Sequence, residues 1–166
     1  MLQLFLALWP DPATRETLAS RQRGWTWPDR AALVPPGRLH LTLHFLGDVA
    51  QPRLAALVQV LQVPCEPFAL ELGLDEVWSR GVAVLRPESA PDGLLRLHAA
   101  LAQRVASFDL PPDTRPYRPH VTLARRAAGA RPPPQGPRLH WPIDQGYVLA
   151  RSLPDGAGYQ VLERFG

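Results

Sequence analysis

The stretch RLHLTL at residues 38–43 is repeated as RPHVTL at residues 118–123. The chain has only five histidines, so chance is expected to give far fewer than one pair of His-apolar-Thr-Leu matches. Both copies have the alternation of a β-strand, in which successive side chains point to opposite faces. Each histidine therefore shares a face with the threonine two residues later, while Leu41 and Val121 are predicted to point into the core.

The histidine and threonine side chains of the repeat are His40, Thr42, His120 and Thr122. A single copy would favour a structural role on a half-buried sheet, but two matching copies favour a site, because such groups contribute little to a core. Threonine hydroxyls can donate to phosphoryl oxygens, and two imidazoles can divide the proton transfers of an in-line displacement between a base and an acid. The repeat thus predicts phosphate chemistry that requires no metal ion.

The segments around the first copy are predicted to follow a strand-helix order twice. In order, the patterns predict a strand at 2–9, a helix from Pro12 to Gly24 with Asp11 before it, a strand at 38–46 and a helix at 52–63. His44 continues the parity of His40 and is expected to be an exposed strand residue.

The segments around the second copy predict a similar succession. The patterns predict strands at 68–78 and 82–85 around a turn at 79–81, a helix at 94–108, a strand at 118–126, a mobile surface loop at 127–137, and a closing antiparallel pair at 147–153 and 159–165. The expected fold class is α+β.

Length and composition bound the other possibilities. The 166 residues, of which 46% are hydrophobic, predict one globular domain spanning residues 1–166. The single cysteine, Cys65, excludes an internal disulfide and a thiolate metal cage, and no apolar run is long enough for a membrane anchor, so a cytoplasmic location is expected. All 18 basic residues are arginine, and the net charge of +3 permits an anionic partner.

Four blocks of the sequence resemble the two-histidine (2H) phosphoesterase superfamily, and within it the bacterial and archaeal RNA 2′,3′-cyclic phosphodiesterases, also called the 2′-5′ RNA ligase family. The blocks are LFLALWP, LHLTLHFLGDV, YRPHVTLAR and RSLPDGAGYQVLERF. They occur in the order and approximate spacing expected of that family. The resemblance covers essentially the whole chain.

The resemblance implies a bilobal α+β fold, with two pseudo-symmetric lobes of antiparallel sheet, outer helices and a central groove. It implies hydrolysis of RNA 2′,3′-cyclic phosphate ends to 2′-phosphomonoesters, with no cofactor. His40 would be the proton donor to the 3′ oxygen, His120 the proton acceptor that activates water, and Thr42 and Thr122 the phosphate ligands. The assignment of donor and acceptor rests on the family alone, because the two copies are nearly symmetric.

Other residues near the repeat are candidates for substrate binding. Arg118 shares the parity of His120 and is the first non-histidine candidate, because guanidinium groups bind phosphate. Arg125 has the opposite parity but lies in a block that matches the family. Further possible contacts to phosphate or to stacked bases are Arg38, Trp78, Tyr117, Arg126 and Arg131.

Three alternative functions stay open. The same site could join RNA ends through a 2′-5′ linkage, or it could bind RNA ends or nucleotides without turnover. A metal-dependent hydrolase is less favoured, because the histidines are accompanied by threonines and not by carboxylates. The expected partner is RNA with a 2′,3′-cyclic phosphate end or a cyclic nucleotide, with no membrane and no obligatory protein partner.

Overall fold

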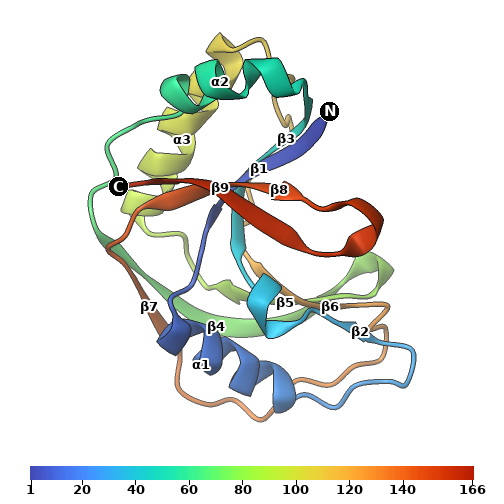
Figure 1. Cartoon of the computed structure of the whole chain (residues 1–166). Coiled ribbons are helices and arrows are strands. Elements are labelled where there is room, and N and C mark those ends of the chain that lie inside the picture. The colour runs from blue at the N-terminus through green and yellow to red at the C-terminus, as the bar shows by residue number, and fades with distance from the viewer.

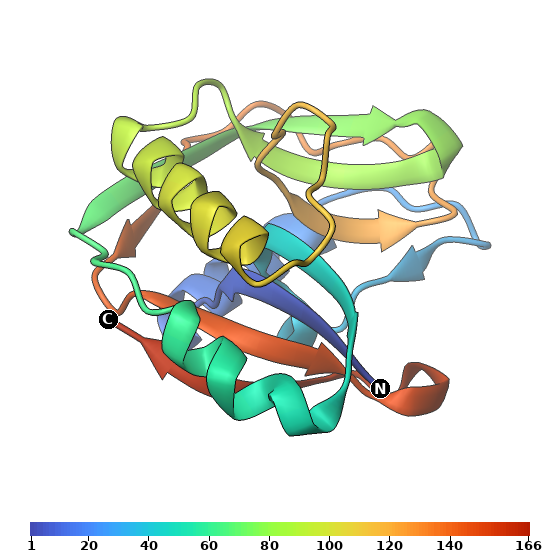
Figure 2. The same cartoon turned by 90° about the horizontal axis from the view of Figure 1, so that it is seen from above.

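The computed structural model describes residues 1–166 and is built on one curled, nine-stranded antiparallel sheet (Figures 1 and 2). The strands are β1 (Leu2–Leu8), β2 (Ala32–Leu33), β3 (Leu41–Val49), β4 (Phe68–Trp78), β5 (Val82–Pro87), β6 (Val121–Arg125), β7 (Leu139–Ile143), β8 (Tyr147–Ser152) and β9 (Tyr159–Phe165). The α-helices are α1 (Pro12–Arg23), α2 (Leu54–Val60) and α3 (Asp92–Ser107). The predicted α+β class, with antiparallel strands and outer helices, is confirmed.

The sheet consists of two four-stranded halves that meet at its centre. Its order is β7-β4-β5-β6-β3-β1-β8-β9, and β2 pairs separately with β6. The motif strands β3 and β6 are the two central neighbours, and they pair at one position only, Leu41 with Val121. Each half contains the same unit of strand, helix and motif strand, β1-α1-β3 and β5-α3-β6, which is the two-lobed arrangement implied by the resemblance.

The helices of the two units are exchanged between the halves. Helix α1 follows β1 but packs against the other half, where Gln22 donates to the main-chain oxygen of Leu123 and Arg21 forms an ion pair with Asp75 of β4. Helix α3 follows β5 but lies against β3. Figure 1 shows this exchange, with α1 beside β4 and β7 and α3 near β1 and β3. The two halves therefore share one core.

The helix ends follow their local sequence signals. Asp11 accepts a hydrogen bond from the amide of Thr14 at 2.7 Å and caps α1, and the helix stops before Gly24, as predicted. Helix α2 is shorter than expected, because residues 51–53 around Pro52 form a 3₁₀ turn. Helix α3 begins at Asp92, two residues before the predicted start, and buries the expected stripe of Leu94, Leu97, Leu101 and Val105.

Two segments differ from their predictions. Strand β7 was not predicted, because Pro142 and the flanking prolines are typical of a loop. It is an edge strand, a position in which a proline is tolerated. The segment at 127–137 lacks helix and strand, as predicted, but Ala127 and Ala130 are buried, and Thr26 forms a two-way main-chain bridge with Arg131.

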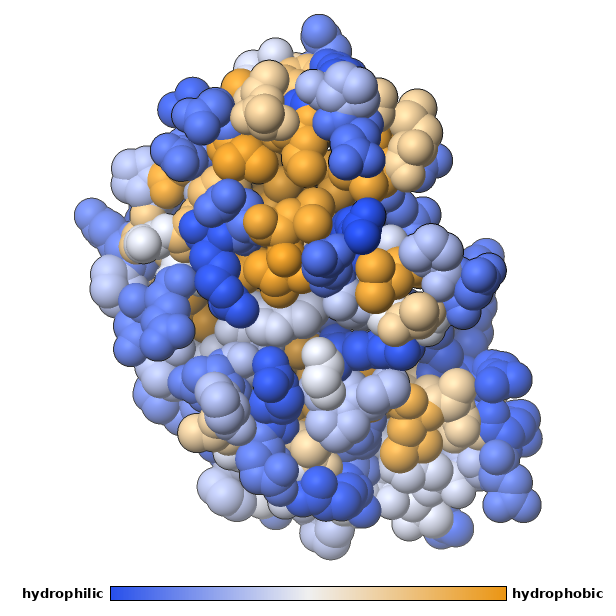
Figure 3. Space-filling view, viewed as in Figure 1, coloured by the Kyte–Doolittle hydropathy of each residue, from blue (hydrophilic) through white to orange (hydrophobic).

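The surface carries apolar and polar regions in separate places. In the view of Figure 3, apolar side chains gather over α2 and the β8–β9 hairpin, while the part around α1 is mostly hydrophilic. None of the three α-helices combines the length and the apolar character needed to cross a membrane.

Candidate active site

The central strand pair brings the four motif side chains together. Because Leu41 lies opposite Val121 in an antiparallel pair, His40 is carried to the position across from Thr122, and Thr42 to the position across from His120. Leu41 and Val121 are fully buried, and the four motif residues are half-buried on the opposite face. The structure thus places two His/Thr pairs on one face of the sheet, as the sequence predicts. We call the side of β3 and β6 that carries His40, Thr42, His120 and Thr122 the motif face.

A β-bulge follows the motif threonine in both strands. In β3, Thr42 pairs with Ala7, but His44 pairs with the adjacent Leu6, so that Leu43 is the extra residue. Cross-strand partners lie on the same face of a sheet, whereas consecutive residues of one strand lie on opposite faces. Ala7 shares the motif face with Thr42, so Leu6 and its partner His44 lie on the opposite face. The next residue, Phe45, turns toward the motif face.

The second motif strand repeats this bulge. Thr122 pairs with Val84 of β5, whereas Ala124 pairs with the adjacent Ala83, so the bulge falls at Leu123. Arg125, which simple alternation would place on the opposite face, therefore lies on the motif face with Thr122. Phe45 and Arg125 occupy equivalent positions, three residues after each motif threonine.

The prediction for His44 is wrong, because the bulge directs its ring to helix α3. Its Nε2 donates to the main-chain oxygen of His98 at 2.8 Å, and the two rings stack with centroids 4.0 Å apart. Tyr117 stacks on the other face of His98 at 3.8 Å and donates its hydroxyl to the main-chain oxygen of Thr42 at 3.1 Å. Tyr117 therefore supports the first motif strand, and its ring and hydroxyl are already engaged.

His40 lies among aromatic rings. Trp9 stacks on it at 5.3 Å with an interplanar angle of 15°, Phe5 lies at 5.1 Å, and Tyr159 meets it edge-on at 5.2 Å. Burial among these rings lowers the pKa of His40, and the charge of nearby His120 lowers it further.

His120 has one aromatic neighbour and two nearby cationic groups. Its ring is 4.6 Å from that of Trp78, and the guanidinium of Arg118 covers the Trp78 ring at 4.0 Å. Burial lowers the pKa of His120 most, and the charges of Arg118 and Arg125 lower it too. Trp78 is fixed by a hydrogen bond from its Nε1 to Glu76 at 2.9 Å.

Both histidines are oriented by the main chain. Nδ1 of His40 donates to the main-chain oxygen of Arg38 at 2.7 Å, and Nδ1 of His120 donates to that of Arg118 at 2.6 Å. A carbonyl oxygen can only accept, so Nδ1 carries the hydrogen in each neutral ring. Nε2 is then the nitrogen available for proton transfer in both histidines.

A sequence model of the 2′-5′ RNA ligase superfamily matches residues 10–146. The chain belongs to this superfamily. The matched region contains both motif strands and all three α-helices.

Individual members of the 2′-5′ RNA ligase superfamily match over nearly the whole chain. An RNA 2′,3′-cyclic phosphodiesterase of Thermus thermophilus is 34% identical over 191 residues, covering 99% of this chain and 89% of the relative. One of Escherichia coli is 30% identical and covers 98% of this chain and 95% of the relative. The crystal structure of E. coli LigT complexed with 3′-AMP superposes with a TM-score of 0.85 at 29% identity, covering 98% of this chain and 96% of that one.

Three other arginines predicted from the sequence lie outside the two His/Thr pairs. Arg38 donates to the main-chain oxygen of Gly156 at 3.1 Å and packs against Gly158, so its side chain holds the loop that leads into Tyr159. Arg126 is exposed just beyond β6. Arg131 is exposed at the main-chain bridge to residue 26.

Several residues of the motif face escaped sequence analysis. Phe5, Trp9 and Tyr159 surround His40, and Phe45 is 51% exposed on the same face. One signal was present in the sequence: in the opening strand, Phe5 has the parity opposite to the core leucines. Glu76, which holds Trp78 and accepts a bidentate pair of hydrogen bonds from Arg86, has no recognisable motif around it.

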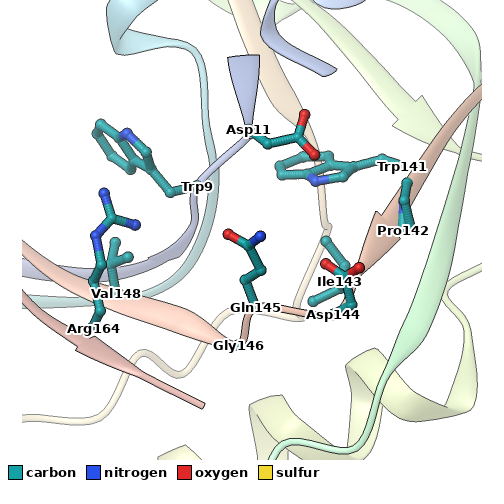
Figure 4. A pocket seen from close by; sticks show the side chains of 10 residues that line it. All are labelled: Trp9, Asp11, Trp141, Pro142, Ile143, Asp144, Gln145, Gly146, Val148 and Arg164. Carbon is teal, nitrogen blue, oxygen red and sulfur yellow. The ribbon is translucent and has the colours of Figure 1, made fainter. Parts of the chain in front are cut away.

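A separate pocket lies beside Trp9. Figure 4 shows its polar lining, which includes Asp11, Gln145 and Arg164, and it contains none of the four motif residues. No group of three or more His, Cys, Asp or Glu side chains is arranged to hold a metal ion. The metal-free mechanism stays a prediction.

Proposed function

We propose that this chain hydrolyses RNA 2′,3′-cyclic phosphate ends to 2′-phosphomonoesters, with His40 as general acid and His120 as general base and without a metal ion. The observation that carries the proposal is the register of the central strand pair, which gathers two His/Thr pairs on one face with each Nδ1 bound to a carbonyl. Relatives named RNA 2′,3′-cyclic phosphodiesterases support the same substrate.

The reaction is an in-line displacement at phosphorus. Nε2 of His120 accepts a proton from water, and the water oxygen forms a new bond to phosphorus. The bond between phosphorus and the 3′ oxygen breaks, and that oxygen receives a proton from Nε2 of His40. Thr42 and Thr122 donate hydrogen bonds to the non-bridging oxygens, and the guanidinium of Arg125 offsets their charge.

The surroundings of the two histidines support this division of roles. The charges of Arg118 and Arg125 favour the neutral form of His120, which is the form a base requires. No arginine is among the charges that lower the pKa of His40, which is lowered by burial and by the charge of His120. A bound phosphate adds a negative charge beside His40 and so raises the pKa of His40. The ring then keeps the proton that a general acid must donate.

The domain organisation that we propose is a single unit spanning residues 1–166. The exchange of α1 and α3 between the halves, and one buried cluster that draws residues from both, support this assignment. Neither half would keep its core if it were separated from the other.

The experiment is hydrolysis of a short RNA with a 2′,3′-cyclic phosphate end, in the presence of EDTA, with the product isomer identified. We expect a 2′-phosphate, formed at the same rate without metal and lost in His40→Ala and His120→Ala. His140→Ala is the matched control, because His140 is an exposed histidine paired with Glu71 on β4. Each proton transfer contributes about 10²- to 10⁴-fold, so each motif variant should lose at least that much turnover.

Other outcomes would contradict the proposal in distinct ways. Binding of the RNA end without turnover would indicate a binding module. Loss of turnover in EDTA would indicate a metal-dependent hydrolase. A 2′-5′-linked product formed from RNA ends in preference to the monoester would indicate end-joining, in which a 5′-hydroxyl takes the place of water.

A further inference from the structure

Three segments that each carry an exposed arginine meet at one end of the half-sheet formed by β7, β4, β5 and β6. Arg30 donates to the main-chain oxygen of Ala128 at 2.7 Å. The amide of Ala127 donates to the main-chain oxygen of Gly81 at 2.8 Å, which holds the β4–β5 turn with Arg80 beside the loop with Arg126. The views of Figures 1 and 2 agree on this meeting of segments. We call Arg30, Arg80 and Arg126 the arginine rim.

Two residues of the arginine rim have an unfavourable backbone conformation. Arg80 has φ = 65° and Arg126 has φ = 51°, in the left-handed region that glycine adopts without strain. Glycine follows Arg80 directly, at position 81, and also has a positive φ of 72°. Because glycine would satisfy the backbone at positions 80 and 126, the arginine side chains themselves are expected to have a use.

The charge of the arginine rim is poorly compensated. The three segments that form it, residues 26–31, 79–81 and 125–131, contain five arginines and one carboxylate, Asp29. The two acidic residues of strand β4 nearest the β4–β5 turn are engaged elsewhere: Glu76 is paired with Arg86 at 2.5 Å and Asp75 with Arg21 at 2.5 Å. The rim thus presents positive charge to solvent.

The arginine rim continues the motif face along strand β6. Arg126 directly follows Arg125, the last residue of β6, and Arg125 lies on the motif face three residues after Thr122. We propose that the arginine rim binds the phosphodiester backbone of the RNA that precedes the cyclic end. Guanidinium groups suit this role because they form bidentate hydrogen bonds to phosphate oxygens. The inference rests on the proposed function, which places the cyclic phosphate at the histidines.

The test compares a long and a short substrate. A hexauridylate ending in a 2′,3′-cyclic phosphate can reach the arginine rim, whereas uridine 2′,3′-cyclic phosphate has no second phosphate to do so. The variants are Arg80→Gly and Arg126→Gly, which relieve the left-handed backbone and should leave Tm unchanged or raised. We expect the KM of each for the hexamer to rise about threefold, while the kinetics of the mononucleotide stay unchanged.

Salt dependence gives a second, electrostatic readout. Each lost phosphate contact to a single strand should reduce the slope of log(kcat/KM) against log[salt] by about 0.7 for the hexamer only. Asp109→Gly is the matched backbone control, because Asp109 also has a positive φ, of 58°, and carries no cation. Arg104→Ala is the charge control, because Arg104 is exposed on helix α3, away from the motif face.

The results separate this inference from the proposed function. Equal effects on hexamer and mononucleotide, or an unchanged salt slope, would overturn the arginine rim as an RNA contact. If the parent hydrolyses neither substrate, the proposed function fails, but anisotropy titration of a labelled hexamer still decides the inference. Weaker hexamer binding in both glycine variants, with controls at parent affinity, would then support it, and unchanged binding would overturn it.

Discussion

The two motif strands have the same backbone course and different surroundings. Each carries its histidine and threonine on one face, and each has a bulge at the leucine that follows. The residue that this bulge turns onto the motif face is Phe45 in the first strand and Arg125 in the second. The repeated backbone fixes where reacting groups lie, and the side chains around it decide how each histidine behaves.

The difference extends beyond those two positions. His40 has Trp9 stacked on it, with further aromatic rings nearby, while His120 has the cations Arg118 and Arg125 as neighbours. An aromatic half and a cationic half therefore meet at one strand pair. In the mechanism that we propose, this asymmetry gives the two imidazoles distinct proton-transfer roles.

The largest expected effect is the loss of kcat when either motif histidine is replaced. We expect His40→Ala and His120→Ala each to reduce kcat by about 10²- to 10⁴-fold on the natural cyclic phosphate. A substrate with sulfur in place of the 3′ oxygen leaves as a thiolate, which needs no proton. His40→Ala should recover most of its rate on that substrate, and His120→Ala should not.

The measurement is single-turnover kinetics of both variants on both substrates. Recovery of His120→Ala in place of His40→Ala would reverse the acid and base assignment. Recovery of neither would show that the two histidines do not divide the proton transfers in this way. Wild-type rates on the sulfur substrate provide the reference for intrinsic reactivity.

The next effect concerns the charge of the cationic half. Arg125→Gln should reduce kcat/KM by about 10- to 100-fold, the usual cost of removing a hydrogen bond to a charged group. Arg125 also lowers the pKa of His120, so its removal raises that pKa. A base must be neutral to act, so the acidic limb of the kcat/KM profile should move to higher pH.

The pH profile of Arg125→Gln distinguishes an electrostatic role from a structural one. An acidic limb that stays in place, or moves to lower pH, would contradict the proximity of this charge to His120. Arg126→Gln, measured on uridine 2′,3′-cyclic phosphate, is the neighbouring control and should match the parent in both rate and profile.

A smaller effect tests the aromatic half. Phe45 is 51% exposed on the motif face, where a base of the RNA end can stack on it. Phe45→Leu keeps an apolar side chain but removes the ring, and we expect KM for the cyclic-ended hexamer to rise about fivefold, the equivalent of about 1 kcal/mol of stacking. Leu33→Ala, at another exposed apolar residue that is 42% exposed, should leave KM unchanged.

The smallest expected effect concerns the ring stack of His44, His98 and Tyr117, which has no counterpart in the second motif strand because Ala124 replaces His44. Burial lowers the pKa of His98 to about 4, below its unfolded value of 6.5. Between pH 6.5 and 4 the unfolded state binds more protons at His98 than the folded state does. The contribution of neutral His98 to the free energy of unfolding is therefore complete above pH 6.5 and is lost as the pH falls toward 4.

His98→Phe keeps a stacked ring and removes this titration. Because solvent reaches part of the stack, we expect the pH-dependent loss of stability in the parent to exceed that in the variant by about 1 kcal/mol, or about 2–4 °C in Tm. Between pH 6.5 and 4, the parent should lose that much more Tm than the variant. Parallel curves for the two proteins would show that His98 is not held neutral by its surroundings.

The motif pairs could be predicted from the sequence because strand alternation and repetition are both visible in it. The bulges could not, because one extra residue in a strand shifts the register without a characteristic residue type. That shift alone explains why His44 and Arg125 lie on the faces opposite to those expected. The neighbours of His40 were missed for a related reason. Strand β1, which carries Phe5 and leads into Trp9, and strand β9, which begins at Tyr159, have places in the sheet that no local sequence pattern encodes.

The Nδ1 hydrogen bonds of the two histidines make the site robust to mutation in a specific way. Each acceptor is a main-chain oxygen, two residues before the histidine, which every amino acid supplies. A substitution at position 38 or 118 thus leaves this acceptor in place, and Nε2 stays the free nitrogen of each imidazole. The backbone thus sets the tautomer of both rings, while the side chain at position 118 adjusts the pKa of His120, which the charge of Arg118 lowers.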